Sequence, residues 1–457
     1  MAYDLLIRGA QVVTGAGVDH LSIGVEEGKI VAREPADSAA GVRGAAREII
    51  DARGLHVFPG VIDAHVHFNE PGRTEWEGAA TGSAALSAGG GTVFIDMPLN
   101  SSPPTLDAAS FSAKRAALEK ASRTDFALWG GLTPDNIGEL EALAECGVVG
   151  FKAFMSASGI EDFRRCDDDS LFRGMQIAAR LGLPVAVQAE NDGMVSALSA
   201  AARAGGRTSV RDYLDSRPVV AEAEAIARAL LFAEQTGCSL HVVHTSSARG
   251  VSLVRAAVAA GLCDATCETC PHYLLLDERD VVSRGAGAKC APPVRSAVER
   301  EKLVAEVAAG RVDTIGSDHS PSPADMKGSE DFFKVWGGIS GVQTTLRALL
   351  TLDLPLALVA RLLSENVASR FKLRGKGGIR IGADADLALI DLSVTAPLRA
   401  GELLDRHRAS PYVGRTFRGA VKQTLVRGRA VFKDGVPVGP PIGLFLKPAR
   451  KQAPPLS

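Results

Sequence analysis

The sequence predicts an α/β fold in which a (β/α)8 TIM-like barrel is joined to a small β-sandwich domain built from both chain ends. Eight short apolar segments, each typical of a buried strand, alternate with segments typical of amphipathic helices in the middle of the chain. Such alternation is characteristic of a parallel sheet covered by helices. Both ends instead alternate apolar and polar residues between glycine-rich turns, as antiparallel strands do. We expect the barrel over residues 57–377 and the sandwich over 1–56 and 378–457.

The two ends of the chain supply the strands of the expected sandwich. Apolar and polar residues alternate at 4–8, 21–25, 29–31, 386–391 and 422–431. These segments have little helical sequence between them, so we expect the two ends to meet in one β-structure. The last residues, 448–457, contain proline and lysine and lie at a terminus, so they are expected to be disordered.

The barrel strands are expected at short apolar runs in the middle of the chain. These runs are 55–64, which leads to His65, and 92–96, 125–129, 149–154, 184–188, 239–244, 265–268 and 314–318. Helical segments such as 222–236 and 299–309 lie between them. In barrels of this type the active site gathers at the C-terminal ends of the strands. Polar residues at these ends are therefore the candidates for function.

The composition is that of a protein with a large core and no strong surface charge. Hydrophobic residues make up 46% of the 457 residues, charged residues make up 23%, and the net charge is −2. This balance favours neither nucleic acid nor an anionic membrane as a partner, and no apolar stretch reaches the roughly 18 residues that span a bilayer. The seven cysteines form an odd, scattered set, which indicates reduced thiols and a cytoplasmic protein. Cys267 and Cys270 have the spacing of half a zinc ribbon, but no second pair completes it, so we interpret them as structural.

The most informative motif is His65-Val66-His67, which follows an apolar strand. Residues two apart on a strand share a face, so both imidazoles can bind one cation at the C-terminal end of that strand. Imidazole suits zinc and related divalent ions. Further candidates stand at later strand ends, namely Lys152, Gln188, His244 and Asp318. Because the strand ends of a barrel meet at one mouth, this series predicts a metal-dependent hydrolase.

Three of these candidates also have a structural interpretation. Lys152 is either an ordinary lysine at a strand end or, after reaction with carbon dioxide, an anionic carbamate that bridges two ions. His244 is a core histidine or a ligand, and Asp318 is a turn cap or a ligand. As a ligand, Asp318 can take the proton of a metal-bound water and pass it to a leaving nitrogen. A divalent ion lowers the pKa of such a water to about 7.

The arrangement of these residues resembles the cyclic-amidohydrolase branch of the amidohydrolase superfamily, and the resemblance covers nearly the whole chain. It implies a centre of two divalent ions, zinc being the expected metal, bridged by N6-carboxylysine at Lys152. Its other ligands would be His65, His67, His244 and Asp318, with Asp318 also catalytic. The branch has a histidine after the fifth strand, where this chain has Gln188 in Gln-Ala-Glu-Asn. An amide oxygen binds zinc more weakly than an imidazole does, so the role of Gln188 and the occupancy of the second site stay open.

Within this branch, the segments around the centre are most similar to those of allantoinases. The similar segments are 69–78, 96–101, 268–273, 288–293, 317–321 and 336–341. Dihydroorotases that resemble this chain have an arginine for the substrate carboxylate where this chain has Asn69, and a neutral amide cannot replace it. The resemblance implies that Asn69, Asn100 and the backbone around Cys290 and Pro292 hold the substrate ring. For both asparagines, turn formation is the alternative.

The resemblance implies an enzyme of purine degradation that hydrolyses the cyclic amide of allantoin to allantoate. It also implies a homo-oligomer, since tetramers are common among such enzymes. Two alternatives stay open. A hydantoinase-like or dihydropyrimidinase-like enzyme would keep the mechanism and change the ring. A non-catalytic amidohydrolase paralogue is supported by Gln188 in place of a ligand histidine.

Overall fold

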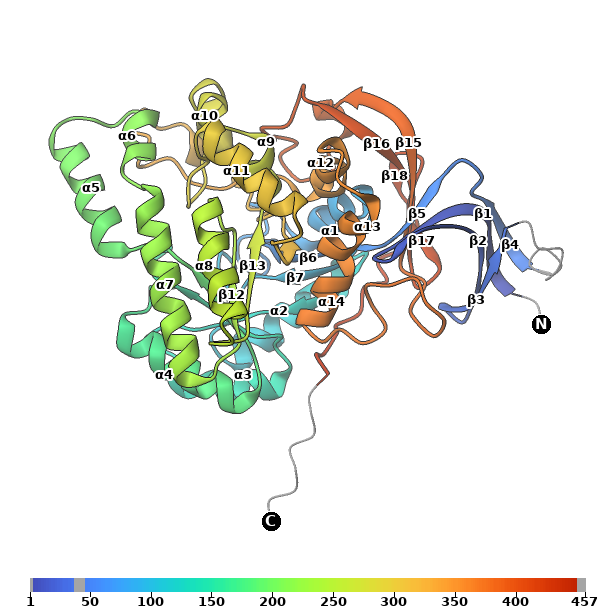
Figure 1. Ribbon diagram of the computed structural model, residues 1–457, viewed down its shortest axis with the longest axis horizontal. Coiled ribbons are helices and arrows are strands. Elements are labelled where there is room, and N and C mark those ends of the chain that lie inside the picture. Colours follow the sequence, from blue (N-terminus) through green and yellow to red (C-terminus); the bar gives the residue numbers. More distant parts are fainter. Residues whose placement is uncertain (1–2, 37–45, 450–457) are drawn as a thin grey trace, which may run out of the picture.

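The computed structural model describes residues 3–36 and 46–449 (Figure 1). Its described strands form three sheets, one made by both ends of the chain and two that together make a parallel barrel. In Figure 1 the N-terminal strands, drawn in blue, and the C-terminal strands, drawn in red, lie on the same flank of the barrel. The predicted α/β class, with a TIM-like barrel and a separate sheet from the chain ends, is confirmed.

The sheet of the chain ends has nine strands in the order β18-β17-β16-β15-β5-β1-β2-β3, with β4 paired to β1. Its members are β1 (Tyr3–Thr14), β2 (Gly17–Glu26), β3 (Lys29–Pro35), β4 (Ala46–Asp51), β5 (His56–Pro59), β15 (Leu387–Pro397), β16 (Thr416–Val426), β17 (Arg429–Lys433) and β18 (Val436–Pro437). The pairs are antiparallel except that β1 runs parallel to β4 and β5. The two ends meet where Leu387 of β15 stands opposite Pro59 of β5.

The barrel strands run parallel in the order β6-β7-β8 and β9-β10-β11-β12-β13-β14. They are β6 (Val61–Val66), β7 (Gly91–Asp96), β8 (Asp125–Leu128), β9 (Gly130–Gly131), β10 (Phe151–Phe154), β11 (Val185–Gln188), β12 (Leu240–Val242), β13 (Ala265–Thr269) and β14 (Thr314–Ile315). Only Trp129 separates β8 from β9, so the two act as one interrupted strand. A bridge between Val66 and His319 closes the ring. All eight predicted strand positions are thus occupied.

The predicted first strand, 55–64, is divided into two strands. Its first part is β5 in the sheet of the chain ends, and its second part is β6 in the barrel. Gly60 lies between them, where an added Cβ would stand 2.1 Å from the Thr92 hydroxyl oxygen. Glycine therefore allows the chain to pass close to β7 while it crosses from one sheet to the other. The division into domains at residues 57 and 377 stays a prediction.

The helices lie between the barrel strands and after them. They are α1 (Ala79–Ala88), α2 (Ala108–Ala121), α3 (Leu140–Cys146), α4 (Asp168–Leu181), α5 (Asp192–Ala204), α6 (Val210–Asp215), α7 (Val219–Thr236), α8 (Ala248–Ala259), α9 (Pro271–Leu275), α10 (Glu278–Arg284), α11 (Ala297–Ala308), α12 (Thr345–Thr351), α13 (Leu356–Ala360) and α14 (Asn366–Arg370). A π-helical segment, Arg361–Glu365, joins α13 to α14. Short 3₁₀ segments occur at Ile137–Glu139, Gly285–Ala288, Ala324–Lys327, Val342–Thr344 and Ala400–Glu402. The predicted helices 222–236 and 299–309 correspond to α7 and α11.

Helix α4 shows how local sequence determines where a helix begins, ends and packs. The Asp167 side chain accepts a hydrogen bond from Ser170 N at the start of α4, which ends at Gly182 with a left-handed φ of 65°. Leu171, Met175 and Ala178 are buried on one face of this helix, as a spacing of three and four residues requires.

A buried ion cluster joins the barrel to the sheet of the chain ends. Lys376 is 2% exposed, and its Nζ lies 2.7 Å from Asp125 Oδ2 in the barrel and 2.7 Å from Asp386 Oδ2 beside β15. Buried charges persist when they are paired in this way, and loss of one partner is costly. The cluster therefore fixes the position of the sheet relative to the barrel.

The end of the chain returns to the barrel. Phe126 N donates to Leu444 O at 3.0 Å, and Ala449 N donates to Lys372 O at 2.9 Å. Of the tail predicted to be disordered, residues 450–457 lie outside the described residues. Among the helices that the structure describes, none combines the length and the apolar character needed to cross a membrane.

Candidate metal centre and active site

The predicted site residues gather around one cavity of ≈ 310 Å³ at the C-terminal ends of the barrel strands. Its wall includes His65, His67, Asn100, Lys152, Gln188, His244, Cys290 and Asp318. Asn69 and Pro292 are not part of the wall. Asn69 is 1% exposed and its amide has no hydrogen-bond partner among the described residues, while the Pro292 carbonyl accepts from the Tyr273 hydroxyl at 2.6 Å. The substrate roles of these two residues stay predictions.

Asp318 lies against both histidines of the first motif. Its Oδ1 is 3.3 Å from His65 Nε2 and 3.4 Å from His67 Nε2. One ligand atom from each of the three residues lies within 4.8 Å of the other two. Two ligands that each bind a zinc ion at about 2.1 Å with tetrahedral geometry stand about 3.4 Å apart. The spacing of these three side chains therefore fits one divalent ion.

A second group of candidate ligands lies on β10 and just after β12. Lys152, on β10, is fully buried, and its Nζ has no hydrogen-bond partner among the described residues. Burial lowers the pKa of Lys152 to about 8. His244 is 3% exposed, its Nδ1 also lacks a partner among the described residues, and its ring centroid lies 5.3 Å from that of His65. Buried polar atoms rarely lack partners, so these atoms are suited to ligands that come from outside the chain.

Four of the predicted residues have a left-handed backbone that non-glycine residues seldom adopt. The φ angles are 63° at Asn69, 70° at Asn100, 37° at His244 and 47° at Asp318. Each residue follows the end of a barrel strand, where the chain must turn sharply into the loop. Strained backbone of this kind costs about 1–3 kcal/mol and concentrates at functional sites. The strain places these side chains at the barrel mouth.

Glu268, on β13, orients the first histidine. Its Oε1 lies 2.7 Å from His65 Nδ1, and its Oε2 lies 3.7 Å from His241 Nε2. Burial by itself raises the pKa of the Glu268 carboxyl, but the charges of His65 and His241 and their hydrogen bonds outweigh burial and hold that pKa well below its usual range. An ionised carboxylate on Nδ1 directs Nε2 of His65 toward the cavity, as in carboxylate–histidine–metal triads. His241 is not part of the cavity wall and lies against the second oxygen of Glu268.

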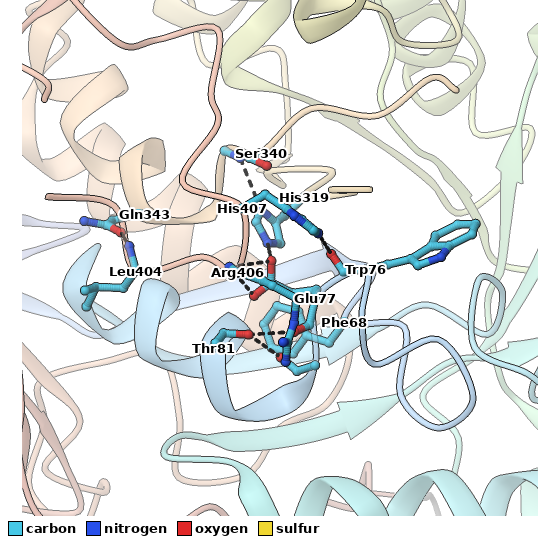
Figure 2. A network of polar contacts seen from close by, with 12 residues as sticks. Phe68, Trp76, Glu77, Thr81, His319, Ser340, Gln343, Leu404, Arg406 and His407 are labelled. Atoms are coloured by element: carbon cyan, nitrogen blue, oxygen red, sulfur yellow. Dashed lines mark hydrogen bonds and ion pairs between the residues drawn. The ribbon is translucent and has the colours of Figure 1, made fainter. Parts of the chain in front are cut away.

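A polar network connects the barrel mouth to the segment between β15 and β16 (Figure 2). His319, next to Asp318, has its Nε2 3.3 Å from Glu77 Oε2. Arg406 holds the same glutamate, since Arg406 N donates to Glu77 Oε1 at 3.2 Å and Arg406 Nε donates to the Glu77 carbonyl at 2.6 Å. His407 Nε2 is 3.1 Å from the carbonyl oxygen of Trp76. Arg406 and His407, from the segment between β15 and β16, thus hold the loop that follows β6 in position.

Two lysines, one buried and one partly buried, hold the rim of the cavity. Lys289 is 5% exposed, and its Nζ donates to the carbonyl oxygens of Phe332 at 2.6 Å and Val335 at 2.5 Å. Lys327 Nζ donates to the carbonyl of Gly338 at 2.9 Å. The rim also contains Trp336, whose ring packs edge-on against Trp76 at 4.9 Å. The loop 332–338 is therefore tied down by side chains that the substrate does not need to displace.

The charge state of Lys289 depends on its surroundings. Burial and the nearby cations Arg217 and Lys327 together lower the pKa of Lys289 to about 7, against the opposing effect of Asp331. An ammonium has three N–H donors and a neutral amine has two. The hydrogen bonds from Lys289 to the rim carbonyls are therefore strongest when its amine is protonated.

Sequence reasoning gave no role to Glu268, Glu77 or Lys289, although all three lie in the segments that carried the resemblance. Their partners are remote in the chain, so no local pattern identifies them. Cys267 and Cys270 are buried free thiols, and across the described ranges the one group of histidine, cysteine and acidic side chains able to hold an ion is the His65, His67 and Asp318 set.

Comparison with known proteins places this geometry in a family. Residues 56–431 match the model of the Amidohydrolase family. The chain is 55% identical over 456 residues to a protein of Rubrobacter xylanophilus named allantoinase, with 99% of each chain covered. It is 54% identical to the allantoinase of Solibacter usitatus, over 94% of this chain and 93% of that one.

A solved structure is similar over nearly the whole length. The L-hydantoinase (dihydropyrimidinase) from Arthrobacter aurescens superposes with a TM-score of 0.93 at 35% identity, over 97% of this chain and all of that one. The D-hydantoinase (dihydropyrimidinase) from Thermus sp. has a TM-score of 0.90 at 26% identity.

Proposed function

The chain belongs to the amidohydrolase family, and from this premise we propose that it is an allantoinase, which opens the cyclic amide of allantoin to give allantoate in purine degradation. The observation that carries the proposal is the cavity of ≈ 310 Å³ in which His65, His67 and Asp318 converge. The names of the relatives at 54–55% identity favour allantoin over other rings.

The charges around the cavity support a neutral substrate. Apart from Lys152, the proposed site of carboxylation, the cations of the wall are Arg217, Lys289 and Lys334, and each of these three already has a partner in the chain. Arg217 pairs with Glu190 at 2.5 Å, Lys289 is held by carbonyl oxygens, and Lys334 lies 3.7 Å from Asp331. A dihydroorotate carboxylate would need an unpaired cation of its own. Allantoin is uncharged and needs none.

The residues present fit a pair of divalent ions, for which zinc is the proposed metal. His65, His67 and Asp318 would hold one ion, while carboxylated Lys152 and His244 would hold the other, with Gln188 as the third candidate. Support for carboxylation comes from the buried, unpartnered Nζ of Lys152, since an ammonium beside cations is unfavourable. Bound ions would supply Lewis acidity and make water nucleophilic at neutral pH.

The chain's own residues would bind the ring and move the proton. Asp318 is held as a carboxylate by the neighbouring histidines, which outweigh the effect of burial on its pKa. It would accept the proton of the attacking water and deliver it to the departing ring nitrogen. Asn100, whose Nδ2 lies 3.5 Å from Ser320 Oγ, and the backbone around Cys290 would orient the ring. The loop 332–338, which Lys289 and Lys327 hold in place, would exclude bulk water from the cavity.

The test compares allantoin with hydantoin, dihydrouracil and dihydroorotate at fixed metal and bicarbonate. The proposal expects the highest kcat/KM for allantoin. Asp318→Asn is expected to abolish turnover with the fold intact by circular dichroism, while Asp353→Asn, at an exposed carboxylate, should leave turnover unchanged. Preferred turnover of dihydrouracil would instead establish the hydantoinase-like alternative, which the Arthrobacter structure favours. Absence of both metal and turnover after supplementation would establish a non-catalytic paralogue.

We further propose a cytoplasmic homo-oligomer, with a tetramer as the expected form. The seven cysteines are all free thiols within the described ranges, which suits a reducing compartment. Val220 and Leu231 on α7 are 56% and 53% exposed, and their spacing of eleven residues puts them on the same face of the helix. Exposed apolar side chains on one helix face are available for association with a second copy of the chain. Light scattering coupled to gel filtration measures the oligomeric state directly.

A further inference from the structure

Gln188 is the irregular member of the candidate metal centre, and its immediate neighbours determine what it can do there. It ends β11, is 4% exposed, and lies in the cavity wall with Lys152 and His244. A glutamine amide has a donor end and an acceptor end, and only the oxygen can bind a cation. The question is therefore which end faces the cavity.

Glu190 and Arg217 determine which end of the Gln188 amide faces the cavity. Gln188 Nε2 donates to Glu190 Oε2 at 3.1 Å, and Arg217 Nη1 donates to the same oxygen at 2.5 Å. Glu190 Oε2 therefore accepts hydrogen bonds from both side chains, and the guanidinium of Arg217 is a donor only. A reversed amide would set its carbonyl oxygen against a carboxylate oxygen. The amide nitrogen must therefore face Glu190, which turns Oε1 away from it.

Arg217 is itself fixed, so the orientation does not depend on a mobile side chain. Its guanidinium lies over the Tyr213 ring at 5.4 Å, and its carbonyl oxygen accepts a hydrogen bond from Arg295. Glu190 is 1% exposed, and its other oxygen, Oε1, has no partner among the described residues. The pair is therefore a rigid support rather than a surface ion pair.

We propose that Glu190 and Arg217 are positioning residues that aim Gln188 Oε1 into the metal centre, so that the second divalent ion has an oxygen-rich set of ligands. This rests on the proposed metal-dependent function. The first ion keeps two imidazoles, whereas the second would be held by the Gln188 amide oxygen, the Lys152 carbamate and His244. Carbonyl and carboxylate oxygens suit manganese, and imidazole suits zinc. The preference of the second site is therefore shifted from zinc toward manganese.

The experiment measures metal content without reference to turnover. Apoprotein is reloaded in bicarbonate with manganese in excess over zinc, the metals per chain are counted by elemental analysis, and bound manganese is followed by electron paramagnetic resonance. We expect two ions per chain, one of them exchangeable for manganese. Gln188→His is expected to raise the preference of the second site for zinc over manganese about tenfold.

The positioning role is tested by Glu190→Gln, whose amide can donate as well as accept and so leaves Gln188 free to turn. Its affinity for the second ion is expected to fall about 10–100-fold, with the first ion retained. Glu365→Gln is the matched control, because Glu365 accepts a hydrogen bond from Gly15 N in the sheet of the chain ends. Gln188→Leu removes the amide oxygen of residue 188 and keeps the ion pair of Glu190 with Arg217. This variant tests the proposed ligand if Glu190→Gln does not fold. It is expected to bind one ion.

The outcomes separate this inference from the proposed function. Two ions in Gln188→Leu, or an unchanged second affinity in Glu190→Gln, would overturn the positioning role even if allantoin is hydrolysed. An unchanged zinc-to-manganese preference in Gln188→His would overturn the oxygen-rich site. Failure of the wild type to hydrolyse allantoin, with these metal results as expected, would refute the substrate assignment alone.

Discussion

Gly316 offers a sharp test of how Glu268 controls the first histidine. Gly316 follows β14 and lies behind the metal centre, where an added Cβ would stand 2.7 Å from Glu268 Oε2 and 2.8 Å from His65 Cβ. Ordinary contacts begin at 3.4 Å, so the methyl group of Gly316→Ala must displace one or both groups by about 0.6–0.7 Å. The φ angle of Gly316 is not positive, so the effect is steric and not one of backbone strain.

The magnitude follows from two separate costs. Overpacking a tight interior costs about 1–3 kcal/mol in the free energy of unfolding. Displacing a carboxylate that orients a ligand histidine lowers metal affinity about 10–100-fold, or about 1.4–2.7 kcal/mol. The first cost is measured as the unfolding midpoint of the apoprotein in denaturant. The second is measured by competition for the metal with a chelator of known affinity.

Gly341→Ala is the matched control. A Cβ at Gly341 would meet the Ser317 carbonyl and the Tyr412 ring at 3.6 Å, which is ordinary contact, although this glycine also contacts the residues on either side of Asp318. We expect this control to bind metal as the wild type does. If Gly316→Ala also keeps wild-type metal affinity, the hydrogen bond from His65 to Glu268 does not govern the metal site, and the reasoning is refuted.

Three further predictions concern the rim, the brace and the metal. Lys289→Met removes the donor to the Phe332 and Val335 carbonyls, so KM for allantoin is expected to rise about tenfold at pH 7, which corresponds to the loss of about one charged hydrogen bond. Since the pKa of Lys289 is lowered to about 7, the wild-type KM should rise as the pH is raised from 7 to 9 and the ammonium loses its proton. If the KM of Lys289→Met rises with pH as much as that of the wild type, deprotonation of Lys289 is not the cause of the rise. His407→Ala frees the carbonyl of Trp76 and is expected to lower kcat/KM about threefold with metal content unchanged, because one neutral hydrogen bond contributes about 0.5–1.5 kcal/mol. Dialysis against a chelator should abolish turnover, and recovery should need a divalent metal and bicarbonate together. Full recovery without bicarbonate would argue against carboxylation of Lys152.

The barrel and the convergence of the candidate ligands on one cavity could be predicted because both depend on local pattern. Each buried strand is a short apolar run, and each run ends at a polar residue, so topology alone brings distant residues to one mouth. Lys152, His244 and Asp318 reach the same cavity for this reason. The break at Gly60 was missed, because the run 55–64 is apolar on both sides of it and only the contact with Thr92 reveals it.

The supporting residues could not be predicted, because each acts through a partner that the sequence does not place beside it. Glu268 and His65 are 203 positions apart, and Glu77 and Arg406 are 329 apart. Neither pair belongs to a repeating pattern. Gln188 was recognised as irregular from its motif, but the direction of its amide depends on Glu190 and Arg217, whose ion pair exists only in the folded chain.

The reach of Arg406 and His407 into the barrel mouth means that the catalytic unit is not the barrel alone. A shortened protein that stops at residue 377 would lose both side chains as well as Asp386, the partner of Lys376. Exchange of mouth loops between homologous enzymes must therefore transfer segments from both halves of the gene together. A chimaera that takes the loop after β6 from one parent and the segment between β15 and β16 from another would have a mismatched pair.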